Sequence, residues 1–257
     1  MSKKFILVAG VLVAASAHGQ VLYTTAGATA AQTFSSLPVN TSNTALASTW
    51  VNNTTLTGWD RTSNGAKQST FLAGSGVTST GGMYSFGAVN SSDRALGLIT
   101  NDPYGTSASF GVQLENQTGK SLKGLQVAYT GEQWHRGKAV GQSLVFSYST
   151  DATSLTTGTW TTVSSLSFNA LKSGFDGQLD GNAAANRSSL GGFLSPVVAQ
   201  GNSIWMKWTL GRPLTGSSAG LAVDDFTFRA SPVPEPFTMV TLGLGAIGII
   251  ARRKKRN

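Results

Sequence analysis

Short segments in which apolar and polar residues alternate dominate the chain between residues 20 and 231. A period of two places every second side chain on the same face of a strand. The clearest examples are ASFGVQL (108–114), LQVAYT (125–130), SLVFSYS (143–149) and SIWMKWTL (203–210). Because each segment has one apolar face, the pattern predicts an all-β fold, an antiparallel β-sandwich of jelly-roll type.

The pattern predicts a single domain over residues 20–231, because turns rich in Gly, Asn and Asp separate the alternating segments and no repeat of fixed period occurs. Residues 24–80 are rich in Thr and Ser and hold scattered aromatic residues, which favours edge strands and long loops. No long stretch has helical periodicity.

Residues 1–19 begin with Lys3 and Lys4, continue with an apolar core over residues 5–15 and end in small residues. This order is typical of a secretory signal peptide, and the apolar core is too short for a first transmembrane helix. The sequence therefore predicts an exported protein.

Residues 232–257 contain three parts in order: a Pro-rich entry, an apolar run over residues 237–251 and a basic end. The run predicts a membrane-spanning helix, and the basic end predicts a cytoplasmic anchor. Fifteen residues span only about 22 Å of a hydrocarbon core about 30 Å thick, so a temporary anchor fits at least as well as a permanent one. The residues of the basic end are Arg252, Arg253, Lys254, Lys255 and Arg256.

The net charge of +8 belongs to the two terminal segments. Without Lys3, Lys4, Glu235 and the five terminal cations, 12 Lys and Arg face 10 Asp and Glu. A basic surface for nucleic acid is therefore not expected on the domain. The absence of Cys excludes thiolate zinc sites and cysteine nucleophiles, and a Ser-His-Asp mechanism would have to use His135, since His18 borders the signal peptide.

The C-terminal segment closely resembles the PEP-CTERM sorting signal of Gram-negative bacteria that make extracellular polysaccharide. The motif residues are Val233, Pro234, Glu235 and Pro236. The resemblance implies recognition and cleavage near this motif by a membrane-embedded exosortase. It further implies transient anchoring in the inner membrane, followed by delivery to the cell envelope, the surface or the extracellular matrix.

Several segments between residues 84 and 229 resemble a bacterial jelly-roll module that recurs in PEP-CTERM proteins. They include YSFG (84–87), GNAAANR (181–187) and GLAVDDF (220–226). The resemblance implies a β-sandwich of no settled function. By analogy with carbohydrate-binding jelly rolls, Asp224 is a candidate ligand for a structural calcium ion; no other cofactor is expected.

The last segment places Ala222, Asp224, Phe226 and Phe228 on one face if the strand is regular, which would bury Asp224 among apolar neighbours. A buried carboxylate needs a partner. Loop amides, or an arginine such as Arg94 or Arg187, are the favoured alternative to calcium.

Glu132 and Asp225 are candidates for a paired-carboxylate site of glycoside cleavage. The simpler interpretation of the cluster around Glu132 is a packed Trp134 and a Glu132–Arg136 ion pair. Likewise, Asn182 and Asn186 with Arg187 favour loop-fixing hydrogen bonds over a substrate clamp.

Two catalytic patterns occur without their structural context. Gly216, Ser218 and Gly220 satisfy G-x-S-x-G, but the following residues predict a strand, whereas a nucleophile elbow requires a helix there. Gly243, Gly245 and Gly248 satisfy G-x-G-x-x-G within the terminal apolar run, where no βαβ unit is present.

Trp205 is the best candidate for stacking on a sugar ring, because Ile204, Met206 and Trp208 occupy the opposite face of its segment. We therefore expect a non-enzymatic exported protein of the surface or biofilm matrix, structural or in contact with exopolysaccharide. The alternatives are a glycan-active hydrolase and an adhesin that binds another protein.

Overall fold

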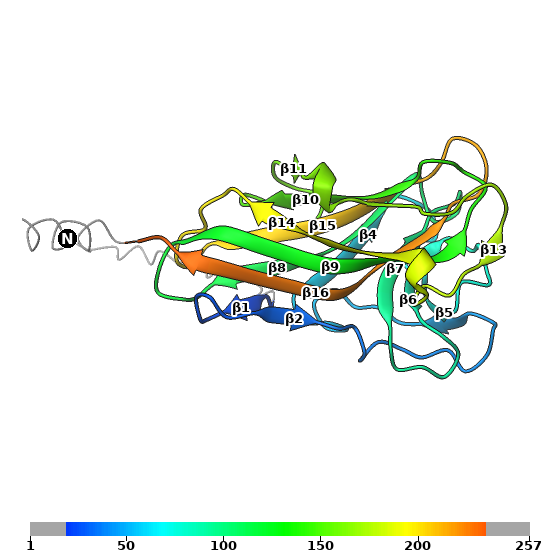
Figure 1. Cartoon of the computed structure of the whole chain (residues 1–257), viewed down its shortest axis with the longest axis horizontal. Coiled ribbons are helices and arrows are strands. Elements are labelled where there is room, and N and C mark those ends of the chain that lie inside the picture. The colour runs from blue at the N-terminus through cyan, green and yellow to red at the C-terminus, as the bar shows by residue number, and fades with distance from the viewer. Residues whose placement is uncertain (1–18, 235–257) are drawn as a thin grey trace, which may run out of the picture.

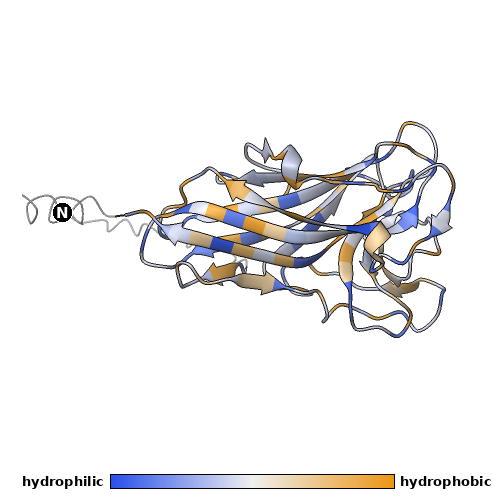
Figure 2. Ribbon diagram, in the orientation of Figure 1, coloured by the Kyte–Doolittle hydropathy of each residue, from blue (hydrophilic) through white to orange (hydrophobic). Residues whose placement is uncertain are grey.

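Each of the four alternating segments forms a strand where its pattern predicts one. The computed structural model describes residues 19–234, and within them these segments lie in β8 (Ser107–Asn116), β9 (Leu122–Arg136), β10 (Ser143–Ser149) and β15 (Ser203–Gly211). Figure 2 shows apolar and polar bands alternating along the long front strands.

The described strands form two sheets packed face to face (Figure 1). The seven-stranded sheet contains β8, β10 and β15 with β1 (Val21–Tyr23), β4 (Trp59–Ser63), β11 (Thr161–Thr162) and β12 (Phe168–Asn169). The nine-stranded sheet contains β9 with β2 (Ala30–Gln32), β3 (Leu46–Ser48), β5 (Phe71–Gly74), β6 (Gly82–Phe86), β7 (Ala95–Ile99), β13 (Gly177–Gln178), β14 (Arg187–Leu194) and β16 (Gly220–Pro232).

These sheets confirm the predicted sandwich of jelly-roll type, with two local departures. The pairs β1–β8 and β5–β6 are parallel, which the alternation does not indicate. Residues 24–80 supply only short strands, as predicted, and the described helices are two single 3-10 turns, η1 (Ser164–Leu166) and η2 (Ala184–Asn186).

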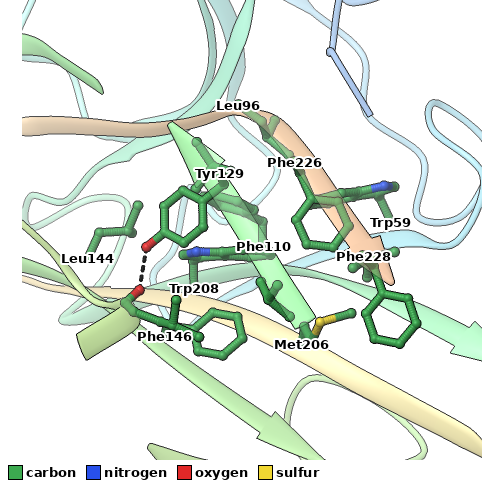
Figure 3. Packing of buried hydrophobic residues seen from close by; sticks show 14 of the residues in the cluster. Trp59, Leu96, Phe110, Tyr129, Leu144, Phe146, Met206, Trp208, Phe226 and Phe228 are labelled. Atoms are coloured by element: carbon green, nitrogen blue, oxygen red, sulfur yellow. Dashed lines mark hydrogen bonds between the residues drawn. The ribbon is translucent and has the colours of Figure 1, made fainter. Parts of the chain in front are cut away.

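The inner faces of the two sheets meet around Trp208, which is fully buried (Figure 3). Its ring stacks on Trp59 at 5.8 Å between centroids and meets Phe226 edge-on at 5.6 Å. The Tyr129 hydroxyl donates a hydrogen bond to the Leu166 carbonyl, which satisfies the polar tip of a buried ring. Residues from both sheets and from η1 thus share one core.

A second apolar cluster lies on the outer face of the nine-stranded sheet. Tyr84 stacks on Phe86, and Phe86 stacks on Trp134. A Cβ added to Gly181 would lie 2.3 Å from the Trp134 indole, so only glycine lets the loop before η2 pass so close. Consequently β6 and β7 are buried on both faces, which a single alternating face does not predict.

A β-bulge divides β16 into two halves. Asp225 adopts a left-handed conformation with φ of 49°, and the pairing with β9 shifts between Asp224 and Thr227. Ala222 belongs to the outer cluster, whereas Phe226 lies in the inner core. The prediction that Ala222, Asp224, Phe226 and Phe228 share one face is therefore wrong, because the extra residue exchanges the two faces within the strand.

Candidate functional site

A cleft of about 520 Å³ opens at one end of the sandwich. It lies between the loop after β7 and the loop from β15 to β16. Figure 1 shows the loop from β15 to β16 at the upper right. Its lining is rich in hydroxyl and charged groups: Ser79, Thr100, Asn101, Asp102, Thr106, Arg212, Pro213, Leu214, Gly216, Ser217 and Ser218. No local pattern in the sequence indicates this cleft, because its residues come from separate loops.

The floor of the cleft is held by a buried hydrogen-bond network. The Ser218 hydroxyl lies 3.1 Å from the Thr100 hydroxyl and accepts a bond of 2.9 Å from the Gln142 amide. The Gln142 oxygen accepts a bond of 2.6 Å from the Ala219 backbone N–H. Each floor group is fixed by neighbours from other elements, so the cleft is preformed.

The rim of the cleft carries an exposed ion pair. Arg212 Nη1 contacts Asp102 Oδ1, and the Asp102 side chain is 90% exposed. Exposed ion pairs contribute little to stability, and both groups can exchange partners at low cost. The rim thus offers a guanidinium donor beside a carboxylate acceptor.

Ser217 connects the cleft to His135. The Ser217 hydroxyl donates to Asp176 Oδ1, and His135 Nε2 lies 3.6 Å from the same oxygen. The hydrogen bond from Ser217 and the nearby Lys138 ammonium lower the pKa of Asp176. His135 Nδ1 lies 2.7 Å from the Gly76 carbonyl. In a Ser-His-Asp triad the imidazole lies between the serine hydroxyl and the carboxylate, where it activates the nucleophile. The His135 imidazole does not lie between Ser217 and the Asp176 carboxylate.

Ser218 of the G-x-S-x-G pattern is followed directly by strand β16. No helix follows it, so the structural context of a nucleophile elbow is missing, as the sequence analysis expected. Its hydroxyl is buried and bonded within the floor network.

Glu132 and Asp224 form a buried pair of carboxyl groups on neighbouring strands. Burial raises the pKa of Glu132 to about 7 and that of Asp224 to about 8. Glu132 Oε2 accepts a bond of 2.8 Å from the Trp134 indole N–H, and Asp224 Oδ1 accepts one of 2.7 Å from the Asp225 backbone N–H. The predicted burial of Asp224 is confirmed.

The predicted partners of these carboxyl groups differ from those in the structure. Arg136 does not pair with Glu132; its guanidinium lies 3.8 Å from the centroid of the Phe175 ring. Arg94 does not bond to Asp224; it donates to Asn40 and to Ser85. The packed position of Trp134 is confirmed.

The predicted catalytic pair, Glu132 and Asp225, does not line the described cleft. Glu132 is 1% exposed, whereas Asp225 is exposed at the bulge. Asn182 and Asn186 bond to Asp93 and to the Asp180 backbone, and so fix their loop as expected.

A structural calcium ion at Asp224 stays a prediction. Within residues 19–234, no group of three or more His, Asp or Glu side chains is arranged to hold a metal. A calcium ion at Asp224 would therefore take most of its ligands from backbone carbonyls, neutral side-chain oxygens and water.

Trp205 is not an exposed sugar platform. It is 3% exposed and packs with Ala152 and Leu155 beneath the loop that follows β10. The predicted alternation of faces along β15 is present, but this loop covers the outer face of the strand. Trp160, on the same loop, is half-buried, and the Lys207 ammonium lies 3.6 Å from the centroid of its ring.

The sorting segment begins where the sandwich ends. The Val233 N–H donates a bond of 2.8 Å to the Ser121 carbonyl, and Pro234 is exposed. Glu235, Pro236, the apolar run 237–251 and the basic cluster 252–256 lie outside the described residues, as does the predicted signal peptide up to residue 18. Within residues 19–234, no helix is long and apolar enough to cross a membrane.

Comparison with solved structures finds similarity to the Lys-gingipain K2 cleaved adhesin domain, with 13% identity, a TM-score of 0.36, and coverage of 78% of this chain and 97% of that one. A xylan-binding domain from CBM22 shows 7% identity, a TM-score of 0.35, and coverage of 70% and 91%. TmCBM61, solved in complex with β-1,4-galactotriose, shows 12% identity, a TM-score of 0.29, and coverage of 55% and 74%.

Comparison with curated proteins finds no match. Residues 232–256 match the family model of the PEP-CTERM protein-sorting motif. The chain is therefore a β-sandwich joined to a PEP-CTERM sorting motif, which marks an exported protein processed by exosortase-type machinery and sorted through the membrane to the cell envelope.

Proposed function

We propose that the protein is a non-enzymatic component of the cell surface or exopolysaccharide matrix that contacts polysaccharide through the cleft between the β7 and β15–β16 loops. The observation that carries this proposal is the position of the cleft. The loop that lines the cleft ends just before Gly220, the first residue of β16, whereas the motif residues 233–236 follow Pro232, the last residue of β16. Thirteen strand residues separate the two by about 40 Å.

This separation has a direct consequence for access. If the C-terminal segment is held at the membrane, the length of β16 would keep the cleft away from that attachment and open to the surrounding polymer. The same cleft remains open after cleavage near the motif, since no cleft residue belongs to the sorting segment.

The chemistry of the rim suits sugar hydroxyl groups. A carboxylate accepts hydrogen bonds from two hydroxyl groups, and a guanidinium donates hydrogen bonds to hydroxyl oxygens in a fixed plane. Asp102 and Arg212 supply both groups side by side, and the Thr106 and Ser217 hydroxyl groups also line the cleft. Pro213 and Leu214 supply a small apolar surface, and Leu214 is fully exposed.

The test measures retention of the producer's own exopolysaccharide by the full-length protein. We expect Arg212→Ala and Asp102→Asn each to weaken retention about 10-fold or more, since each leaves hydroxyl groups unpaired. Arg229→Ala is the matched control, because Arg229 is an exposed arginine near the opposite end of β16. Equal retention by all variants, or no retention by the wild type, would refute the assignment to this cleft.

A further inference from the structure

β14 is a long sheet edge without the protection that the other described edges have. It pairs with β9 along eight residues in unbroken register, and no described strand pairs with its other side (Figure 1). Half of the backbone N–H and C=O groups of such a strand point away from its one neighbour. No described backbone hydrogen bond outside the β9 pairing involves residues 187–194.

The other edge strands within residues 19–234 are short or charged. β1, β2 and β3 have three residues, and β11, β12 and β13 have two. β4 has five but carries Asp60 and Arg61. β14 has the sequence RSSLGGFL, in which Arg187 is the sole charged residue, and it has neither proline nor a bulge. Natural sheets protect edges with these devices because an open edge pairs with another strand.

The two faces of β14 differ in exposure. Residues 187, 189, 191 and 193 are exposed, whereas 188, 190 and 192 are half-buried toward the core. Phe193 is 70% exposed, so its ring is accessible to a second chain. Leu166 packs 3.5 Å from the position of a Cβ on Gly192, so η1 covers the inner face of β14 and leaves its edge open.

We propose that β14 pairs antiparallel with β14 of a second copy of this chain, about a two-fold axis through Leu190, so that the two nine-stranded sheets become continuous. A two-fold axis perpendicular to the sheet keeps outer faces on one side, as a closed homodimer requires. In this register residue 187 opposes 193, and residue 189 opposes 191.

Charge and shape favour a second copy as the occupant. Each Arg187 guanidinium lies opposite the exposed Phe193 ring of the other chain, which gives two symmetric cation–π contacts and keeps the two Arg187 side chains at opposite ends of the pair. The part of the chain between the two terminal segments has a net charge of only about +2, so repulsion between copies is weak. Seven residues of strand pairing, 187–193, give an interface about 24 Å long.

Cysteine cross-linking tests this register directly, because the chain has no Cys of its own. Full-length chains carrying Ser189→Cys and Gly191→Cys are expressed together in the producing cell with different tags. A Cβ at position 191 meets only ordinary contacts, the nearest at 3.5 Å, so the change does not strain the strand. We expect a disulfide between the two different chains.

Either chain expressed alone is expected to cross-link at least about 10-fold less. Position 189 lies diagonally from its own counterpart, about 7–8 Å away, beyond the usual reach of a disulfide. Thr161→Cys on the exposed edge strand β11, paired with Gly191→Cys, is the matched control. Absence of the mixed disulfide, or cross-linking no better than in the controls, would overturn the proposal.

A second measurement uses the oligomeric state of the full-length chain in detergent. Phe193→Lys places a cation opposite Arg187, so the dissociation constant of the dimer should rise about 10-fold or more. Val197→Lys is the control, because Val197 is 58% exposed but lies beyond the end of β14. A monomeric wild type at high protein concentration, or cross-linking of β14 to a different protein, would reject the second copy as the occupant.

Discussion

Asp224 and Glu132 illustrate at the level of single residues how position determines protonation. Both carboxyl groups lie on the outer face of the nine-stranded sheet, near the carboxylates of Asp93 and Asp225. Burial raises both pKa values, and the neighbouring negative charges raise them further, while Arg187 partly opposes the effect at Glu132. At neutral pH these groups therefore bind protons that the unfolded chain has already released.

The first prediction is that stability falls as pH rises. Because the folded-state pKa values are above the unfolded values, stability is greatest below the unfolded pKa and declines until pH exceeds about 8. Between pH 5 and pH 9 we expect a loss of about 1–2 kcal/mol, discounted for solvent screening, which corresponds to several degrees in melting temperature. Thermal unfolding followed by circular dichroism measures it.

Asp224→Asn removes the main titrating group and should flatten this pH dependence. Asp102→Asn, at an exposed carboxylate, should leave it unchanged. An equally steep decline in Asp224→Asn would show that other groups cause it.

Strand β16 shows at the level of elements which parts of the structure can be predicted from sequence. Period-two alternation identifies β8, β9, β10 and β15, because each has one face toward a shared core. It fails at β16, since the bulge at Asp225 exchanges the faces, and at β6 and β7, which are buried on both sides. Bulges and outer layers arise from contacts distant in sequence, which a local pattern does not contain.

The difference between local patterns and distant contacts also explains which parts of the candidate site could be predicted from the sequence. The burial of Asp224 and Trp134 is confirmed, but the bulge at Asp225 places Asp224 on the opposite face from the predicted one. The burial of Trp205 depends on a loop that folds back over its strand, and the cleft depends on loops more than 100 residues apart, such as those of Asp102 and Arg212. Neither arrangement has a local signal in the sequence.

The second prediction concerns the bulge. Asp225 has φ of 49°, which aspartate tolerates and β-branched residues do not. Asp225→Gly should retain stability to within about 0.5 kcal/mol or increase it, whereas Asp225→Val should destabilise the fold by about 1–2 kcal/mol. Denaturant unfolding of the two variants distinguishes these effects. Similar stabilities would mean that the bulge moves elsewhere without cost.

The whole molecule has two functionally different ends. The cleft lies at the start of β16, and the sorting motif follows the end of the same strand. Only residues 233–236 separate the strand from the apolar run, a reach of at most about 14 Å. The match to the sorting motif begins at Pro232, so the last strand and the sorting segment adjoin in sequence.

The third prediction concerns sorting. Replacing Pro234, Glu235 and Pro236 with alanines removes the motif but leaves the apolar run, so the uncleaved chain should accumulate in the membrane fraction. Immunoblotting of membrane and surface fractions measures the distribution. Pro213→Ala, at the cleft end, should be processed normally. Normal surface delivery of the triple-alanine chain would show that sorting does not depend on this motif.

The position of β16 between the cleft and the motif also has a mechanical consequence. A pull from bound polymer, resisted at the C-terminus, would load β16 along its own axis. The hydrogen bonds to β9, perpendicular to that axis over most of the strand, would then share the load in shear and would have to break together rather than one after another. A tether built in this way should withstand more force along that axis than when it is peeled open from a sheet edge.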